Sequence, residues 1–202
     1  MPLSVQDHYT KYVTSGGDGP TVLKDRAASL GYEAEWLRSL DDPSMFQASC
    51  GSGCPLRLPG GCPTQDALVM DLGCGAGHDV LLAAALVAAK ENAKVVGVDF
   101  TPAMLEAART NLTKHPTLEP LVELVEASLE DNENNLAKYH GKVDLVISNG
   151  VFNLCRDKAK AFTSVYKLLK PGGRFVFSDV MSVDRDPNAQ IATSINGDVF
   201  SS

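Results

Sequence analysis

The sequence contains no apolar run that approaches the roughly 18 to 20 residues needed to cross a bilayer. Its first residues, MPLSVQDHYTKY, also lack the apolar stretch of a secretory signal. These two absences argue against a membrane-spanning or secreted protein. We therefore expect a soluble, cytoplasmic protein that has no membrane partner.

Basic residues are in the minority. The 18 lysines and arginines are outnumbered by 25 acidic residues, the formal net charge is -7, and no predicted helix carries a basic stripe. A protein that binds duplex nucleic acid needs basic side chains against the phosphates. We therefore expect no nucleic-acid partner, whereas a small-molecule enzyme and a protein-binding module both remain open. The composition gives no indication of the oligomeric state.

Cysteines are few, and their number is odd. Five thiols do not suit a disulfide framework, and 202 residues of 44% hydrophobic composition can bury one core without covalent links. The first three have no histidine nearby, which argues against structural zinc and predicts no metal site. Ordinary loop thiols and thiols that bind a thiophilic substrate both remain open. The five thiols, all expected to be reduced, are Cys50, Cys54, Cys62, Cys74 and Cys155.

The composition changes along the chain and divides it into four segments. Residues 1–43 have helical patterns and form an N-terminal extension, and residues 44–66 form a loop rich in cysteine, glycine and proline. Residues 67–180 have the regular alternation of strand and helix patterns that is typical of one α/β domain. Strong periodicity is lost over residues 181–202, so we expect a truncated C-terminal segment there.

Short apolar runs alternate with helical patterns from residue 67 onward. Thr101 followed by Pro102 is typical of a helix start, and Pro171-Gly172-Gly173 predicts a stop before the last strand. Strands that alternate with helices imply right-handed crossovers. We therefore expect an α/β fold with a doubly wound, mostly parallel sheet, helices on both faces and no final antiparallel strand pair. The expected strands span residues 67–71, 94–99, 121–125, 143–148 and 174–179, and the expected helices span 78–90, 102–114, 136–139 and 158–169.

A glycine-rich turn follows the first of these strands, in the stretch ALVMDLGCGAGHDV of residues 67–80. Gly73, Gly75 and Gly77 allow a sharp turn and the close approach of a ligand, which would face the N-terminus of the next helix. Asp99 ends the second strand, and ligands of open parallel sheets bind at this edge. Its two carboxylate oxygens can accept hydrogen bonds from both hydroxyls of a ribose. A tight turn with a solvated aspartate is the alternative without a ligand.

The glycine spacing separates two classes of nucleotide cofactor. A dinucleotide loop follows G-x-G-x-x-G and leaves room for a pyrophosphate, whereas this loop runs Gly73-x-Gly75-x-Gly77 and is preceded by Asp71. A carboxylate at that strand end would repel a diphosphate and attract an ammonium group. The pattern therefore favours S-adenosyl-L-methionine, which has an adenosine, an amino-acid group and no phosphate, over a nicotinamide cofactor.

These features together resemble class I S-adenosylmethionine-dependent methyltransferases, with a Rossmann-like sheet over residues 67–179. The resemblance implies that the glycine loop contacts the methionine part, that Asp99 holds the ribose and that Phe100 lines the adenine. It also implies that EASLE after the third strand borders the adenine and that ISNG after the fourth faces the substrate. For Met104, an adenine contact and a place in the core both remain open. The predicted cofactor-binding residues are Asp71, Gly73, Cys74, Gly75, Asp99, Phe100, Met104, Ser128, Leu129 and Asn149.

Within this superfamily the chain resembles arsenite methyltransferases, through GHDVLL, GVDFTPAMLEAAR and SNGVFNLCRDKAKAF. That family has a cysteine where this chain has Gly150, and trivalent arsenic needs converging sulfur ligands. Cys50 and Cys54 lie in a context that resembles the family's cysteine loop, and Cys155 lies five positions after the missing thiol. We therefore expect these three cysteines as catalytic residues that ligate a small soft acceptor such as arsenite.

Three other side chains each have two interpretations. In this superfamily an N-terminal helix often closes over the methyl donor, so Tyr9 either contacts the sulfonium or packs in the core. Asp79 opens a helix, where the helix dipole alone favours an acidic residue and a cofactor contact is equally open. Cys74 is expected to pack against the cofactor. For the whole chain, the alternative is a non-catalytic module or fragment that keeps the cofactor fold.

Overall fold

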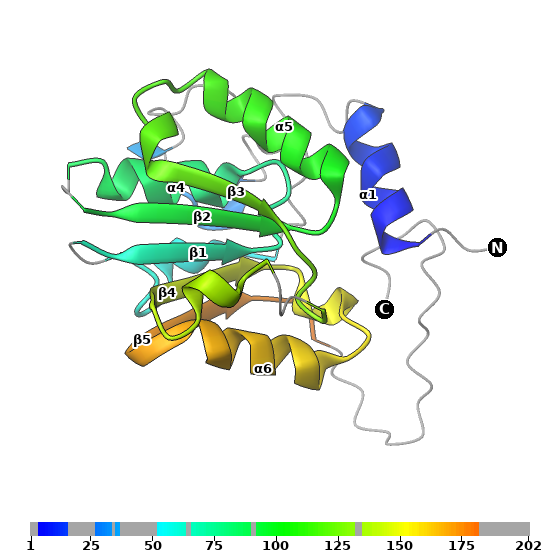
Figure 1. Cartoon of the computed structure of the whole chain (residues 1–202). Coiled ribbons are helices and arrows are strands. Elements are labelled where there is room, and N and C mark those ends of the chain that lie inside the picture. The colour runs from blue at the N-terminus through cyan, green and yellow to red at the C-terminus, as the bar shows by residue number, and fades with distance from the viewer. Residues whose placement is uncertain are drawn as a thin grey trace.

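A five-stranded parallel sheet organises the chain in a computed structural model, with the strand order β3-β2-β1-β4-β5 (Figure 1). The order reverses direction at β1, as in a doubly wound α/β fold. This confirms the predicted fold class. The structure describes residues 4–15, 27–33, 35–36, 52–63, 66–89, 92–131 and 135–181. The strands are β1 (Leu68–Leu72), β2 (Lys94–Asp99), β3 (Val122–Glu126), β4 (Val143–Asn149) and β5 (Leu169–Ser178).

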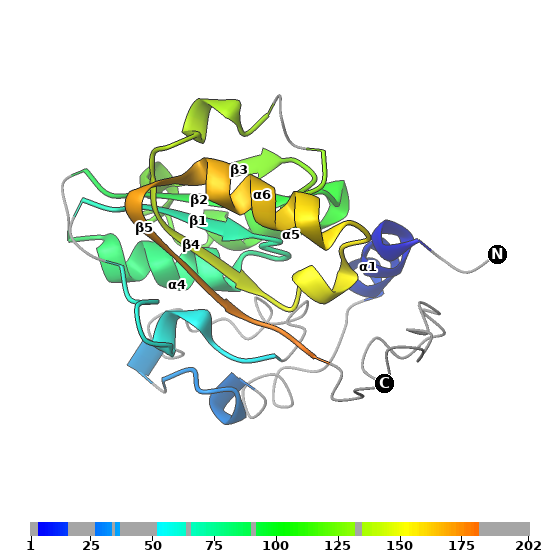
Figure 2. The ribbon, with the colours of Figure 1, turned by 90° about the horizontal axis from the view of Figure 1, so that it is seen from below.

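Helices cover both faces of this sheet, and Figure 2 shows α4 and α6 on opposite sides of it. Three of the four predicted helical ranges, 78–90, 102–114 and 158–169, contain an α-helix. The fourth, 136–139, contains a short 3-10 turn. Thr101 is the N-cap of α5 with Pro102 at its first position, as the sequence indicates. The helices are α1 (Val5–Thr14), α4 (His78–Val87), α5 (Pro102–Thr113) and α6 (Lys158–Leu168), with short 3-10 turns η2 (Pro55–Arg57), η3 (Glu119–Leu121), η4 (Ala137–Tyr139) and η5 (Phe152–Leu154).

The central strands are apolar on both faces because both faces are buried. Successive strand residues point to opposite sides of a sheet, so Val69 packs with α4 and α5, whereas the adjacent Met70 packs with α6. We call these two apolar clusters the α4-side core and the α6-side core. The α4-side core also includes Ala27 and Tyr32 from the N-terminal part of the chain.

The last strand starts earlier than the sequence indicates, so the expected start at residue 174 is wrong. β5 begins directly after α6, at Leu169, which pairs with Val143. The register then shifts, and Leu145 pairs with Arg174. Residues 170–173, between these two paired positions of β5, form a bulge that accommodates the Pro-Gly-Gly sequence. Gly172 in this bulge has a φ of +78°.

The N-terminal helix α1 packs against α5. It begins with a capping box, in which the Ser4 hydroxyl accepts from the Asp7 amide and the Asp7 carboxylate accepts from the Ser4 amide. Gln6 Nε2 donates to the Phe100 carbonyl at 3.0 Å, which ties α1 to the loop after β2.

Several expectations concern residues outside the described ranges. These include Cys50 and the C-terminal stretch 182–202, where no final strand pair was expected. No helix among the described residues has the length and apolar character of a membrane span.

Candidate functional site

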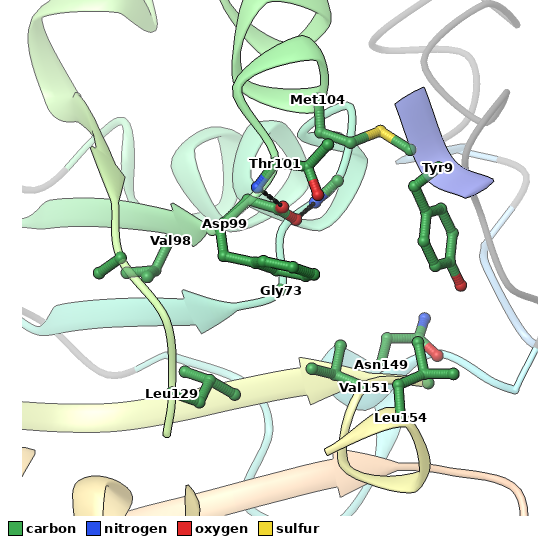
Figure 3. A pocket seen from close by; sticks show the side chains of 14 residues that line it. Tyr9, Gly73, Val98, Asp99, Thr101, Met104, Leu129, Asn149, Val151 and Leu154 are labelled. Atoms are coloured by element: carbon green, nitrogen blue, oxygen red, sulfur yellow. Dashed lines mark hydrogen bonds between the residues drawn. The ribbon is translucent and has the colours of Figure 1, made fainter. Parts of the chain in front are cut away.

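An open cavity lies at the carboxyl ends of β1, β2 and β4 (Figure 3). Ligands of open α/β sheets bind at this edge. Residues of α1, of the glycine loop and of the segments at or after the ends of β2, β3 and β4 line it. The lining residues are Tyr9, Gly73, Gly75, Val98, Asp99, Phe100, Thr101, Met104, Ala127, Leu129, Asn149, Gly150, Val151 and Leu154.

The glycine loop forms one wall of the cavity and is held by backbone hydrogen bonds. The amides of Gly73 and Cys74 both donate to the Val98 carbonyl, at 2.7 and 2.9 Å. Gly73 has a φ of +74°, and a Cβ at this position would lie 2.3 Å from Val151 Cγ2. Glycine is therefore required there both by the backbone conformation and by the close approach of Val151.

Asp99 connects this loop to the end of β2. Its Oδ2 accepts from the Gly75 amide at 2.9 Å and its Oδ1 accepts from the Thr101 amide at 2.8 Å. Burial raises the pKa of Asp99, although hydrogen bonds from Thr101 and Gly75 oppose this effect. Each carboxylate oxygen can accept more than one hydrogen bond. Asp99 can therefore also accept hydrogen bonds from a ligand in the cavity, such as those of a ribose diol.

Two more buried carboxylates lie near Asp99. Burial, followed by the charges of Asp79 and Asp99, raises the pKa of Asp71 well above its ordinary value. Burial would also raise the pKa of Asp79, but the adjacent His78 and the hydrogen bonds from Tyr32 and Asn149 outweigh it and lower that pKa. Where these carboxylates are ionised, their charge favours a cationic ligand over a phosphate.

Apolar side chains also line the cavity. Met104 is 1% exposed and Leu129 8% exposed, whereas Phe100 is 40% exposed. Met104 contributes to both the core and the lining, which were alternatives in the sequence. Ser128, by contrast, is not among the lining residues, and its hydroxyl accepts from the Glu130 amide at 3.2 Å. The apolar slot suits a flat aromatic ring such as adenine.

Tyr9 closes the cavity from α1, and Figure 3 shows its ring across the cavity from Asp99. Val151 and Leu154, just after β4, line the same side. The position of Tyr9 agrees with the interpretation that the N-terminal helix covers a bound ligand. An aromatic face there would attract a cation such as a sulfonium.

The predicted catalytic cysteines do not come together in the described part of the chain. Cys54 is 4% exposed in the α4-side core, and Cys155 is 9% exposed in the α6-side core, where its thiol donates to the Val151 carbonyl. Burial raises the pKa of Cys54 to about 12 and that of Cys155 to about 11. Cys50, the third of the set, lies outside the described residues.

Cys74 and Asp71 are also absent from the cavity lining. The Cys74 thiol lies in the α4-side core, and a Cβ on Gly97 would be 3.1 Å from its sulfur. Burial raises the pKa of Cys74 well above its ordinary value. A contact of Cys74 with a ligand would thus come from its backbone.

Some lining residues were not singled out in the sequence. Val98, Val151 and Leu154 line the cavity, as does Thr101, which was predicted only as a helix start. They flank the predicted positions at the strand ends, so the strand pattern was the signal that could have found them. Among the described residues, no group of three or more histidines, cysteines or acids is arranged to hold a metal ion.

The chain is similar in sequence to known proteins. Over 200 aligned positions the chain is 34% identical to an arsenite methyltransferase of Halobacterium salinarum, covering 91% of this chain and 48% of that protein. It is also 34% identical to an arsenite methyltransferase of Aquipseudomonas alcaligenes, covering 89% of this chain and 51% of that protein. The chain thus spans about half the length of these relatives.

A solved structure has the same fold. The crystal structure of an arsenic(III) S-adenosylmethionine methyltransferase from Chlamydomonas reinhardtii matches with a TM-score of 0.54 and 30% identity, over 80% of this chain and 50% of that one. The family model described as a methyltransferase domain matches residues 63–196, which include the glycine loop, Asp99 and the end of β4. The chain therefore belongs to the methyltransferase domain family.

Proposed function

We propose that this protein is an S-adenosylmethionine-dependent methyltransferase. The observation that carries the proposal is the Asp99 carboxylate, which accepts a hydrogen bond from the glycine loop and lines the open cavity at the carboxyl edge of the sheet. The apolar slot around Met104 and Leu129 would take the adenine and Asp99 the ribose. The three acids near the glycine loop would favour the positively charged sulfonium and ammonium groups.

The cofactor would supply an electrophilic methyl group, so the protein needs mainly to align an acceptor lone pair with it. Tyr9, Val151 and Leu154 line the cavity without a charged side chain. Among these three side chains, only the Tyr9 hydroxyl can take part in proton transfer. A methyl acceptor that already carries a free lone pair at neutral pH needs no deprotonation. Such an acceptor therefore suits this part of the cavity best.

For the acceptor we propose trivalent arsenic or another small soft nucleophile. Support comes from the arsenite methyltransferase relatives, which are similar over most of this chain. Cys54, near the end of β4, would be one sulfur ligand and Cys50 a second. Cys155 is a weaker candidate because it lies on the other face of the sheet from Cys54.

A cofactor-binding module without turnover is the second candidate function. The separation of Cys54 and Cys155 favours it, because arsenic needs converging thiolates. Gly150, which carries no thiol, lines the cavity. The resemblance to arsenite methyltransferases implies a cysteine of that family at this position.

Methyl transfer from labelled S-adenosylmethionine to arsenite, in the presence of a thiol reductant, tests the two candidates. Trp36, the single tryptophan, packs against the same core as Cys54, so its fluorescence should report arsenite binding. We expect labelled methylarsenic product, and an arsenite-dependent fluorescence change that Cys50→Ser and Cys54→Ser weaken. Cofactor binding without product would support the module, and equal fluorescence responses in all three proteins would remove arsenic as the acceptor.

A further inference from the structure

Three buried polar side chains from distant parts of the sequence meet beside the cofactor cavity. Tyr32, Asp79 and Asn149 are 3%, 1% and 8% exposed. The Tyr32 hydroxyl donates to Asp79 Oδ1 at 2.9 Å. One N–H of Asn149 Nδ2 is shared between Asp79 Oδ2, at 3.2 Å, and the Tyr32 oxygen, at 3.1 Å. We call these three residues the Tyr32 cluster.

This cluster is hydrogen-bonded to the segment that carries Cys54. Asn149 Nδ2 donates to the Gly53 carbonyl at 2.7 Å, and Asn149 Oδ1 accepts from the Ser52 hydroxyl at 3.0 Å. Cys54 follows directly and packs in the same α4-side core as Tyr32. Asn149 therefore faces the cavity and also holds the backbone of the cysteine-bearing segment.

Burying these polar groups destabilises the folded protein unless each group keeps its hydrogen-bond partners. Removal of one hydrogen bond in an apolar core leaves a polar group unpaired, because water does not replace the lost partner there. Moving residues 52–54 away would deprive Asn149 of two partners. Removing the Tyr32 hydroxyl would deprive Asp79, Asn149 and His78 of one partner each. The cluster and the segment thus stabilise each other's positions.

We propose that Tyr32, Asp79 and Asn149 are positioning residues that hold the segment Ser52–Cys54, which carries the Cys54 thiol, against the end of β4 that lines the cavity. This inference rests on the proposed function only in assuming that the segment serves the methyl acceptor. Tyr32 and Asp79 do not line the cavity, so their effect on the reaction would pass through the segment.

Tyr32→Phe tests the proposal because it removes one hydroxyl and keeps the ring. The control is Tyr139→Phe, a buried tyrosine of the α6-side core. Iodoacetamide labelling of Cys54, followed by peptide mass spectrometry, measures how firmly the segment is held without requiring activity. We expect labelling in Tyr32→Phe to be about tenfold faster than in the wild type, as loss of roughly one net hydrogen bond implies.

The kinetic readout separates positioning from a general structural defect. In Tyr32→Phe we expect a KM for arsenite raised about tenfold on the same grounds, with the S-adenosylmethionine Kd within about twofold of the wild type. Tyr139→Phe should leave both the labelling rate and the KM unchanged. Ser52→Ala, which removes the hydroxyl bonded to Asn149, should change labelling in the same direction and serves if Tyr32→Phe does not fold.

Unchanged Cys54 labelling in both Tyr32→Phe and Ser52→Ala would overturn the proposal. So would equally accelerated labelling in Tyr139→Phe, because the effect would then be general. Failure of the wild type to bind S-adenosylmethionine or to methylate arsenite would contradict the proposed function instead, and the labelling result would still stand.

Discussion

The Asp99 carboxylate accepts a hydrogen bond at 2.9 Å from the backbone amide of Gly75, which lies 24 residues earlier in the sequence. This bond joins the glycine loop after β1 to the end of β2. The same carboxylate lines the cavity. Asp99 therefore both shapes the cofactor loop and presents an acceptor to a ligand, so the site should be sensitive to changes on either side of this bond.

Gly73→Ala should destabilise the protein and weaken cofactor binding, because the new Cβ would lie 2.3 Å from Val151 at a φ of +74°. We expect a loss of about 2 to 4 kcal/mol in the free energy of unfolding, from backbone strain and overpacking together. Gly141→Ala is the control, since Gly141 has a φ of +68° and no atom within 4 Å of its Cβ position. It should lose only about 1 to 2 kcal/mol from strain in urea unfolding. Equal losses in the two variants would contradict the close packing of Val151 on the loop.

Cofactor affinity should rise with pH. Burial raises the folded-state pKa of Asp71 and Asp99, so the folded protein without ligand retains protons that the unfolded chain has lost. Their contribution to stability is present below the ordinary aspartate pKa of about 3.9 and is lost as the pH rises through the raised values. A cationic ligand binds more tightly when the carboxylates are ionised. Its binding should therefore release protons at pH values between the ordinary aspartate pKa and the raised pKa values of Asp71 and Asp99.

Calorimetry in two buffers of different ionisation enthalpy measures that proton release. Asp71→Asn should reduce both the release and the pH dependence of the S-adenosylmethionine Kd. A Kd that is independent of pH in the wild type would show that these carboxylates do not respond to the ligand's charge.

Tyr9→Ala should weaken binding of S-adenosylmethionine by about 3-fold to 30-fold, the range of a cation–aromatic contact. Tyr9→Phe should retain most of the affinity because the ring remains. Tyr12→Ala is the matched control, as Tyr12 lies on the same helix but not in the cavity lining. If Tyr12→Ala weakened binding as much as Tyr9→Ala, the effect would come from the helix and not from the Tyr9 ring.

The four cysteines in the described part of the chain should differ strongly in reactivity. Cys62 is exposed, whereas Cys54, Cys74 and Cys155 are buried. Burial raises the pKa of Cys54 to about 12, so little thiolate is present at pH 8. Alkylation followed by peptide mass spectrometry should modify Cys62 first. Labelling of Cys54 as fast as Cys62 would contradict its buried position.

The sheet and much of the site were predictable because strands of a parallel sheet end at one edge. Apolar runs located the five strands, and residues at or just after their ends, such as Asp99 and Leu129, line the cavity. The start of β5 was missed because a Pro-Gly-Gly sequence normally ends an element. Here a bulge absorbs it, and only the pairing of Leu169 with Val143 reveals the earlier start.

The Tyr32 cluster could not be predicted from the sequence. Tyr32 and Asn149 are 117 residues apart, and their contact depends on how the N-terminal part packs on the α4 face. The direction of the Cys74 thiol was missed for a similar reason. Gly73 and Gly75 on either side have positive φ angles, and this turn directs the thiol toward Gly97 in the core.

Calorimetric titration of the wild type with S-adenosylmethionine and with NAD, repeated with Asp99→Ala, tests the central claim most directly. We predict that S-adenosylmethionine binds more tightly than NAD, and that Asp99→Ala weakens its binding at least about tenfold, since a charge-assisted hydrogen bond is lost. Tighter binding of NAD, or an unchanged S-adenosylmethionine affinity in Asp99→Ala, would contradict the assignment of this cavity to the methyl donor.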